Sequence, residues 1–429
     1  MIPAKLIEKK RDGFELNSEE IEWFVRGTVE NKIDDCQLSA LLMSIYFNGM
    51  SDSETFSLVN SMVNSGKILE FNNLGKYIAD KHSTGGIGDK TSFVLAPILS
   101  TLDIIVPMIA GRGLAYTGGT IDKLESIPNF QTTMEIKRFE NQIEKVGCGI
   151  ISQSSEICPA DKKIYSIRDL TGTIPSMPLI CSSIMSKKIA EGLDGLIMDI
   201  KVGNGAFMKT ITQARTLAYE LQKIGNAFNI KTDITYSNMS QPLGRYAGLG
   251  CEIFESINCL RGNGPGDLIE LSLDLGAKIL LQNKKAKTES EAKNKMLKTI
   301  NDGSALKKFE EMVDAQGGDL EYLQSSCTNK KNEFSVQADS EGYISSMDTE
   351  KIGWALVEMG CGRRRNRDVL DYSAGIKFNF KVGEKVKVKE QVYTLFGKDI
   401  KKLEIAKSML HKTFKISSEK ISKPKLILS

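Results

Sequence analysis

The chain has 429 residues, of which 41% are hydrophobic and 26% are charged, a composition typical of soluble globular proteins with a substantial core. The 57 basic and 54 acidic residues leave a net charge of only +3, which argues against a dedicated binder of nucleic acids or membrane surfaces. Eight cysteines and two histidines form no recognisable zinc motif. We expect two domains in a cytoplasmic protein with reduced thiols, since neither a signal peptide nor a membrane-spanning run is apparent.

The first 65 residues are predicted to form helices only. A helix start at residues 18–22 is followed by helical apolar periodicity at 37–47 and again at 51–65. Gly49 and Gly66 stand where these two helices are expected to end. With no credible strand in this region, the sequence predicts a small all-helical unit.

Residues 77–92 contain the strongest candidate for a binding site. Lys81 and His82 precede two hydroxyl side chains and three closely spaced glycines. Glycine accepts positive φ and exposes backbone N–H groups, and Asp89 is a good N-cap for the apolar helix expected from Phe93 onward. The cation, the hydroxyls, the glycines and the helix start together predict an anion site, most simply for phosphate. A surface turn is the alternative, and neither the Walker nor the Rossmann glycine spacing is present.

A second glycine-rich loop follows the next extended segment. Residues 103–110 are apolar and rich in β-branched side chains, as in a buried strand. They lead into residues 111–120, which combine glycines with a cation and two threonines. Two loops of this kind predict an α/β sheet that binds its ligand at the strand ends, although the second loop alone is equally typical of a connecting turn.

Residues 161–192 return to helical character. Ser183 and Lys187 are four residues apart, so a hydroxyl and an ammonium group share one helix face. This spacing alone leaves open whether Lys187 belongs to a site or is simply solvated, as we expect for Lys188. Arg168 reaches the same face only through tertiary folding.

The remainder of the chain continues the α/β pattern and then changes character. A buried strand and glycine turn at 195–206 precede a helix from about Thr210, and residues 234–236 form the next predicted strand. Residues 268–309 are helical and lysine-rich. From residue 334 the pattern is one of short strands and turns, with period-two alternation at 381–388 and an exposed strand at the end.

Several long motifs occur in combination over almost the whole chain. They lie at residues 81–89, 111–114, 117–128, 168–169, 182–188, 199–209, 240–248 and 361–365. Together they resemble the motifs of the thymidine/pyrimidine-nucleoside phosphorylase family. The resemblance implies reversible phosphorolysis, in which a pyrimidine nucleoside and phosphate give the free base and a sugar 1-phosphate.

The same resemblance implies the architecture of the protein. It implies an α/β homodimer whose protomer has a small all-helical domain, a large α/β domain with a central mixed sheet, and a C-terminal β-rich segment. The small domain comprises residues 1–65 with 160–192 and binds the pyrimidine. The large domain comprises residues 70–155 with 195–429, binds phosphate, and includes the β-rich part at 334–429. Closure of the two domains brings the substrates together.

Individual site residues follow from the family motifs. The resemblance assigns phosphate to Lys81, Ser83, Ser92 and Thr120. It assigns the pyrimidine to Arg168, Ser183 and Lys187. It assigns catalysis to His82, Arg168 and Lys187. Phosphate is itself the nucleophile, so these groups position the substrates and stabilise negative charge on the departing base, with His82 donating a hydrogen bond or a proton.

Two positions depart from the family pattern. Ala110 stands where the family usually has a serine that contacts phosphate. Tyr116 stands where the family usually has a histidine that latches the closed domains onto the turn corresponding to residues 203–205. We expect both changes to affect phosphate affinity and closure.

The resemblance implies no cofactor and no required metal. Some relatives hold a monovalent cation near the positions of Gly88, Leu243 and Glu255. Glu255 is present here, but Lys90 lies close by in the sequence.

The choice of substrate has several alternatives. Met108 stands where relatives that accept both ribosides and deoxyribosides often have lysine, so we expect a preference for thymidine and deoxyuridine. A broad, uridine-accepting phosphorylase is one alternative, and a non-catalytic nucleoside-binding descendant is another. Phosphoribosyl transfer is a third, but it needs a magnesium–diphosphate site, and no acidic cluster is placed to form one.

Overall fold

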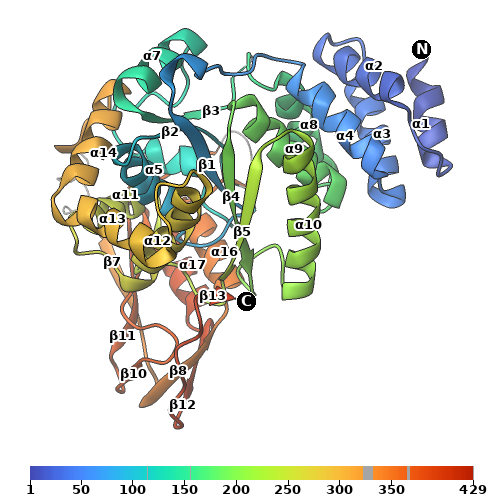
Figure 1. Cartoon of the computed structure of the whole chain (residues 1–429). Helices are drawn as coiled ribbons and strands as arrows, with labels where there is room; N and C mark the ends of the chain where they lie inside the picture. Colours follow the sequence, from blue (N-terminus) through green and yellow to red (C-terminus); the bar gives the residue numbers. More distant parts are fainter. Residues whose placement is uncertain (114, 155, 322–331, 365–367, 429) are drawn as a thin grey trace.

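A six-stranded sheet forms the centre of the computed structural model, which describes residues 1–113, 115–154, 156–321, 332–364 and 368–428. The strands are β1 (Tyr77–Ser83), β2 (Ile104–Ala110), β3 (Cys148–Ser152), β4 (Gly195–Val202), β5 (Lys231–Asn238) and β13 (Ile427–Leu428). Their order is β13-β5-β4-β1-β2-β3, and all neighbours run parallel except β13, which pairs antiparallel with β5 (Figure 1). This confirms the predicted α/β fold with a central mixed sheet. Leu114, Cys327 and Arg365, which belong to motifs or cysteines considered above, lie outside the described residues.

Alternate residues of the inner strands face opposite sides of the sheet. Met108 and Ala110 of β2 pack into one hydrophobic cluster, whereas Ile109 packs into another. Both faces are covered, so every residue of β2 and β4 is buried. The helices associated with this sheet are α5 (Thr91–Thr101), α6 (Thr120–Leu124), α7 (Ile136–Val146), α10 (Ile211–Ala227), α11 (Gly250–Leu260), α12 (Gly266–Gln282), α13 (Glu289–Asn301) and α14 (Ser304–Ala315).

Lys81, His82 and Ser83, which directly precede the glycine loop, are the last three residues of β1. Their backbone pairs in register with residues 197–199 of β4. The expected helix cap is shifted. The helix begins at Thr91 with Lys90 as its N-cap, while the Asp89 carboxylate accepts hydrogen bonds from the Thr91 N–H at 3.2 Å and from its hydroxyl at 2.8 Å.

The N-terminal region contains helices only, as predicted, and projects from the sheet as a separate lobe (Figure 1). These helices are α1 (Pro3–Arg11), α2 (Ser18–Val29), α3 (Asp35–Asn48) and α4 (Asp52–Val63). They share a hydrophobic core with residues of α8 (Pro159–Thr171) and with Leu179 of α9 (Met177–Ala190). The other face of α9 packs Met185 and Ile189 against the sheet. Helix α9 therefore joins the helical lobe to the α/β domain.

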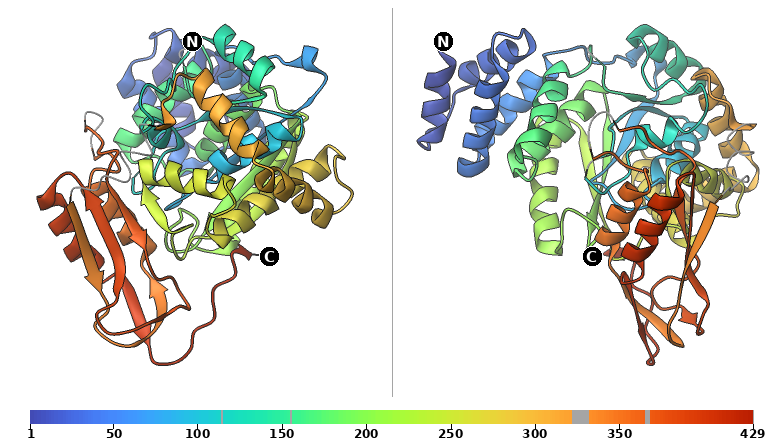
Figure 2. Two further views of the ribbon diagram at one scale, coloured as in Figure 1. Left: turned by 90° about the vertical axis from the view of Figure 1, so that its left-hand side faces the viewer. Right: turned by 180° about the vertical axis from the view of Figure 1, so that it is seen from behind.

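The C-terminal region is rich in strands and forms a further lobe (Figure 2). Strands β6 (Tyr246–Gly248), β7 (Asn332–Gln337), β9 (Gly375–Phe378) and β11 (Gln391–Gly397) form one sheet, and β8 (Gly342–Met347), β10 (Lys385–Val386) and β12 (Phe414–Ser417) form another. Two helices, α16 (Thr349–Glu358) and α17 (Ile400–Leu410), pack against each other. Only residues 385–386 of the alternating run 381–388 are a strand, because Gly383 adopts a φ of +87° in a turn. The chain then returns to the central sheet as β13.

No helix in the described part of the chain is long and apolar enough to cross a membrane.

Lys188, which the sequence indicated to be solvated, is instead buried at the junction of α9 with the sheet. Only 1% of its surface is exposed. Its ammonium group lies 2.5 Å from Asp80 Oδ2 on β1 and 2.6 Å from Glu191 Oε1, and it donates to the Ile109 carbonyl on β2. Burial raises the pKa of Glu191 well above its usual range. The prediction failed because sequence spacing does not show which face of α9 meets the sheet.

We predict that Lys188→Met lowers the free energy of unfolding by about 3–5 kcal/mol, because it leaves two buried carboxyl groups without their cation. Urea denaturation measures this change. Lys162→Met, which alters an exposed lysine on α8, is the matched control and should change the free energy by less than about 0.5 kcal/mol. Equal, small effects of the two variants would contradict this account of the junction.

Candidate active site

The loops that follow four parallel strands meet at the carboxyl edge of the sheet. The Thr84 hydroxyl, after β1, accepts a hydrogen bond from the Lys201 N–H on β4 at 2.9 Å. The Leu243 N–H, after β5, donates to the Ile87 carbonyl at 3.0 Å. Tyr116, after β2, donates its hydroxyl to the Ala206 carbonyl, after β4, at 3.2 Å. Such an edge, where strand connections diverge to opposite sides, is the usual ligand site of α/β sheets.

Two buried ammonium groups share one carboxylate at this edge. Lys81 Nζ lies 3.4 Å from Asp89 Oδ2, and Lys201 Nζ lies 3.6 Å from the same oxygen. Lys201 also pairs with Asp199 at 2.6 Å. Burial lowers the pKa of Lys81. Burial alone would raise the pKa of Asp89, but the ammonium groups of Lys201 and Lys81 hold it well below its usual range. Sequence reasoning gave Lys201 no role, although its alternation with Asp199 along a buried strand was a usable signal.

The three predicted phosphate hydroxyls lie at one strand end and two helix starts. Ser83 ends β1 and its hydroxyl accepts a hydrogen bond from the Gly85 N–H at 3.3 Å. Ser92 is the second residue of α5, and Thr120 is the first residue of α6. Gly85 has a φ of +88°, as expected for an open loop that exposes N–H groups. This arrangement of hydroxyls, N–H groups and ammonium groups suits a tetrahedral anion.

Ser183 and Lys187 of α9 form the predicted one-turn partnership. The Lys187 ammonium donates to Ser183 Oγ at 3.0 Å and to the Ser183 carbonyl. It also donates to Asp161 Oδ2 on α8 at 2.6 Å, and this oxygen accepts a further hydrogen bond from Gln153 at 2.7 Å. Lys187 is only 8% exposed, so the solvated alternative is wrong. Asp161, which the sequence analysis missed, fixes the position of this ammonium group.

Arg168 is buried between α8 and α9. Its guanidinium group donates to the Leu179 carbonyl at 2.9 Å and to the Ile174 carbonyl at 2.7 Å. These bonds hold the turn between the two helices and tie α8 to the first turn of α9. Ser183 and Lys187 lie further along the same helix. Tertiary folding thus brings Arg168 against α9, the helix that carries Ser183 and Lys187. A contact of Arg168 with a base stays a prediction.

His82 lies between the two halves of the candidate site, on β1 beside Lys81. Burial, together with the ammonium groups of Lys188, Lys187 and Lys81, lowers its pKa well below the ordinary value, and the carboxylate of Asp89 offsets this only in part. The imidazole is therefore neutral near pH 7. A neutral ring donates one N–H, so of the two roles expected for His82, donation of a hydrogen bond is favoured over donation of a proton.

Tyr116 connects the loop after β2 with the turn after β4. Besides donating to the Ala206 carbonyl, its ring packs against Phe207 at 5.9 Å and Trp354 at 5.8 Å between centroids. The hydroxyl is thus engaged with the turn near residues 203–205. Ala110 ends β2 and has only a methyl group to offer at this edge.

The positions considered for a monovalent cation do converge, but on a lysine. The Leu243 carbonyl and the Glu255 carboxylate lie 3.2 and 2.5 Å from Lys90 Nζ. The residues present therefore do not fit a dissolved cation at this place. Among the described residues, no group of three or more His, Cys, Asp or Glu side chains is arranged to hold a metal ion.

Comparison with known proteins agrees with this fold. Residues 75–306 match the glycosyl transferase family α/β domain, residues 4–66 its helical bundle domain, and residues 343–417 the pyrimidine nucleoside phosphorylase C-terminal domain. The pyrimidine-nucleoside phosphorylases of Staphylococcus epidermidis and Staphylococcus haemolyticus are each 43% identical over 392 residues, which is 91% of this chain and 90% of theirs. That of Staphylococcus aureus is 42% identical over the same span.

A solved structure shows the fold alone. Anthranilate phosphoribosyltransferase from Thermus thermophilus has a TM-score of 0.58 and 15% sequence identity, covering 73% of this chain and 99% of that one. The helical bundle and the α/β domain thus define a glycosyl transferase of the family that shares these two domains. With the C-terminal domain and the relatives above, the chain belongs to the pyrimidine-nucleoside phosphorylase family.

We predict that His82 stays neutral as the pH falls through about 6.5, the ordinary pKa of histidine. The folded structure lowers the pKa of His82, so its ring is protonated only at more acid pH. The chain has only two histidines, so His411→Gln leaves a single imidazole signal for NMR. That signal should not titrate between pH 8 and 6. A titration midpoint at or above about 6.5 would show that the imidazole is not desolvated as described.

Proposed function

We propose that this protein catalyses the reversible phosphorolysis of pyrimidine nucleosides, with thymidine and deoxyuridine preferred. The observation that carries the proposal is the pair of buried ammonium groups, Lys81 and Lys201, at the edge of the sheet, with a separate Lys187–Ser183 pair on α9. One cluster suits phosphate and the other suits the carbonyl and imide edge of a pyrimidine. The names of the 42–43% identical relatives support the same reaction.

The proposed mechanism uses the two clusters at the same time. Phosphate, held near Lys81, Ser83, Ser92 and Thr120, attacks C1′ of the sugar from the face opposite the base. The C1′–N1 bond breaks with oxocarbenium character, its electron pair goes to the base, and the new C1′–O bond gives the sugar 1-phosphate. Ammonium and guanidinium groups of Lys187 and Arg168 stabilise the charge that develops on the base, and neutral His82 donates a hydrogen bond to it.

No cofactor enters this scheme. Phosphate is already an anionic nucleophile, and the remaining requirements are positioning and charge stabilisation, which the side chains above supply. Phosphoribosyl transfer is less well supported, because the described residues offer no acidic cluster for a magnesium–diphosphate pair. A non-catalytic binder is also less well supported, because both the anion cluster and the α9 cluster are intact.

The preference for deoxyribosides rests on the apolar character of one position. Met108 belongs to the hydrophobic cluster that includes Ala110 on the same face of β2. Its side chain offers no hydrogen-bond partner to a sugar 2′-hydroxyl. A riboside therefore buries its 2′-hydroxyl without a partner, which costs about 1–3 kcal/mol of binding free energy relative to a deoxyriboside.

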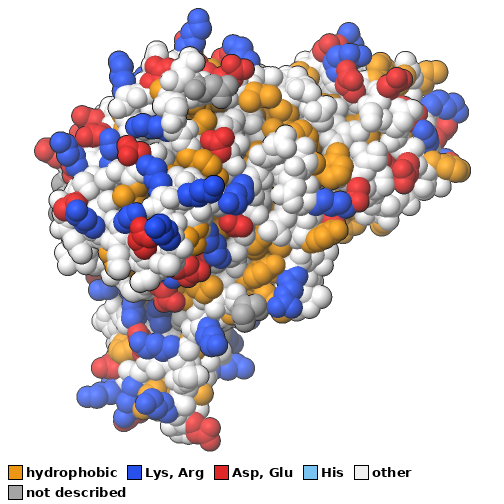
Figure 3. Space-filling view, in the orientation of Figure 1, with side chains coloured by type: hydrophobic (Ala, Val, Ile, Leu, Met, Phe, Trp, Pro, Cys, Tyr) orange, Lys and Arg blue, Asp and Glu red, His pale blue; other side chains and the backbone are white. Residues whose placement is uncertain are grey.

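We also propose a cytoplasmic homodimer. Three aromatic side chains of the helical lobe are exposed, Phe14 by 64%, Phe47 by 75% and Tyr46 by 39%. Figure 3 shows hydrophobic side chains at the surface over the N-terminal helices. Tyr46 and Phe47 also contact each other edge to face, with ring centroids 5.6 Å apart, and an exposed apolar patch of this kind is typical of a protein interface. Sedimentation velocity tests this, and a monomer at micromolar concentration would contradict it.

The direct test incubates the protein with thymidine, deoxyuridine or uridine, with and without phosphate, and quantifies free base and sugar 1-phosphate. We expect equimolar products that require phosphate, and kcat/KM roughly tenfold or more higher for deoxyuridine than for uridine. No base release from any nucleoside would reject the phosphorylase. Equal or better use of uridine would reject only the preference.

We further predict that Lys187→Ala lowers kcat/KM roughly a hundredfold, a loss of about 3 kcal/mol of transition-state stabilisation. The reason is that the charge on the departing base loses an ammonium group that stabilises it. Lys162→Ala, on the exposed side of α8, is the control and should retain activity. The double variant Lys187→Ala/Asp161→Asn removes the unpaired carboxylate as well. Recovery of activity in the double variant would mean that Lys187 acts only by neutralising Asp161.

A further inference from the structure

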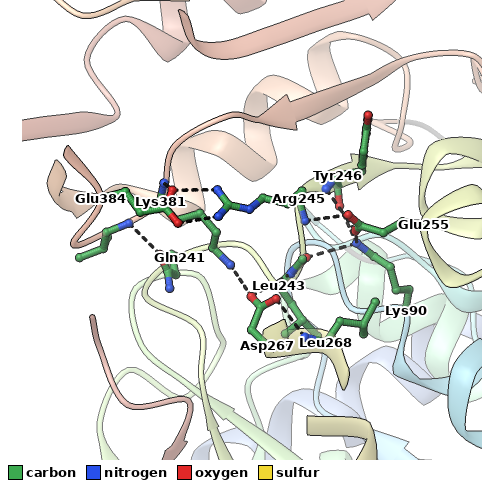
Figure 4. Close-up of polar contacts among 12 residues, drawn as sticks. Lys90, Gln241, Leu243, Arg245, Tyr246, Glu255, Asp267, Leu268, Lys381 and Glu384 are labelled. Carbon is green, nitrogen blue, oxygen red and sulfur yellow. Dashed lines mark hydrogen bonds and ion pairs between the residues drawn. The ribbon is translucent and has the colours of Figure 1, made fainter. Parts of the chain in front are cut away.

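The ammonium group of Lys90 lies in a shell of oxygen atoms. None of its side chain is exposed. Lys90 Nζ lies 2.6 Å from the Tyr246 carbonyl, 3.2 Å from the Leu243 carbonyl and 2.5 Å from Glu255 Oε2, as Figure 4 shows. Main-chain carbonyls and a carboxylate are the ligands that proteins use for hard cations, including potassium. The oxygen atoms therefore form the shell of a cation site, and the cation that fills it is the ammonium group of Lys90.

The backbone packs closely around this group. A Cβ atom placed on Gly88 would lie 2.4 Å from the Leu243 carbonyl oxygen. A Cβ atom on Gly244 would lie 2.4 Å from Glu255 Oε2 and 2.9 Å from Lys90 Nζ. Burial alone would lower the pKa of Lys90, but the carboxylates of Glu255 and Glu252 raise it, so the group stays charged.

The Lys90 ammonium joins three segments of the chain. Lys90 itself lies between the glycine loop after β1 and helix α5, one residue from Thr91 and two from Ser92. Leu243, in the loop that follows β5, and Tyr246, at the start of β6, form the second segment, and Glu255 of α11 belongs to the third. The Glu255 carboxylate also accepts hydrogen bonds from the Arg245 N–H at 2.9 Å and the Tyr246 N–H at 3.2 Å. The ammonium and this carboxylate together set the conformation of the loop beneath the phosphate side.

We propose that Lys90 is a built-in cation, which takes the place of a dissolved sodium or potassium ion and makes the order of these loops independent of either ion. Its link to phosphate binding rests on the proposed function, whereas its effect on stability does not. Leu243, Tyr246 and Glu255 also line a cleft of about 800 Å³. Solvent ions therefore have a path to these oxygens once the lysine side chain is removed.

The test compares the wild type with Lys90→Ser by thermal unfolding in choline, sodium and potassium chloride at one ionic strength. Serine removes the ammonium group and leaves the three oxygens and an added hydroxyl. For the wild type we expect the same midpoint in the three salts. For Lys90→Ser we expect a lower midpoint in choline chloride and a rise of about 3 °C or more in sodium or potassium chloride, because an ion that binds only the folded state stabilises it.

Two variants serve as controls. Lys90→Met fills the space with an apolar chain, so it should be destabilised without recovery in either ion. Lys381→Met removes another buried lysine of the same cleft, which pairs with Asp267. We expect it to show no difference between sodium, potassium and choline.

Two outcomes overturn the proposal. One is a wild-type midpoint that rises in potassium or sodium chloride relative to choline chloride, since the site would then still take a dissolved ion. The other is a Lys90→Ser protein that behaves identically in the three salts. If Lys90→Ser folds only when sodium or potassium is present, the proposal is supported. None of these readouts needs enzyme activity, so failure of the proposed function is seen separately.

Discussion

Buried lysines paired with carboxylates hold the structure together where its candidate site is assembled. A site for an anion needs fixed positive charge out of water, and a buried ammonium group is tolerated only when opposite charge and hydrogen bonds compensate it. Each of the buried lysines near the candidate site pairs with a carboxylate. The pairs are Lys81 with Asp89, Lys201 with Asp199, Lys187 with Asp161, Lys188 with Asp80, and Lys90 with Glu255.

These pairs also connect the parts of the fold. Lys188 links α9 to two strands of the sheet, and α9 packs at the same time against the helical lobe. Lys90 links the loop after β1 to the loop after β5 and to α11. Within the loop after β5, Arg245 pairs with Glu384, so the network reaches the C-terminal lobe as well. Positioning of the site and cohesion of the lobes therefore depend on the same buried charges.

Local sequence patterns predicted much of this arrangement. Period-3.6 apolar runs identified the helical N-terminal region, and β-branched runs identified β2 and β4. The spacing of Ser183 and Lys187 predicted their contact, because residues four apart in a helix are neighbours. Glycine content located the loop at residues 84–90, which follows β1.

Long-range pairing could not be predicted in the same way. Asp161 and Lys187 are 26 residues apart in the chain and meet because α8 and α9 pack side by side. Glu255 and Lys90 are 165 residues apart and meet in the same way, through the tertiary fold. Whether a lysine is solvated or buried depends on the face that its helix turns to the sheet, as Lys188 shows. Tyr116 likewise finds its partner, the Ala206 carbonyl, only in the folded structure.

Calorimetric titration of phosphate and of deoxyuridine, in separate experiments, shows whether the paired ammonium groups at the sheet edge form the phosphate site. The proteins to compare are the wild type, Lys81→Met and the exposed-lysine control Lys162→Met. We expect Lys81→Met to weaken phosphate binding at least about tenfold, because a charge-assisted hydrogen bond is lost, while deoxyuridine binding changes little. Unchanged phosphate affinity in a folded Lys81→Met protein would show that this ammonium group does not bind phosphate.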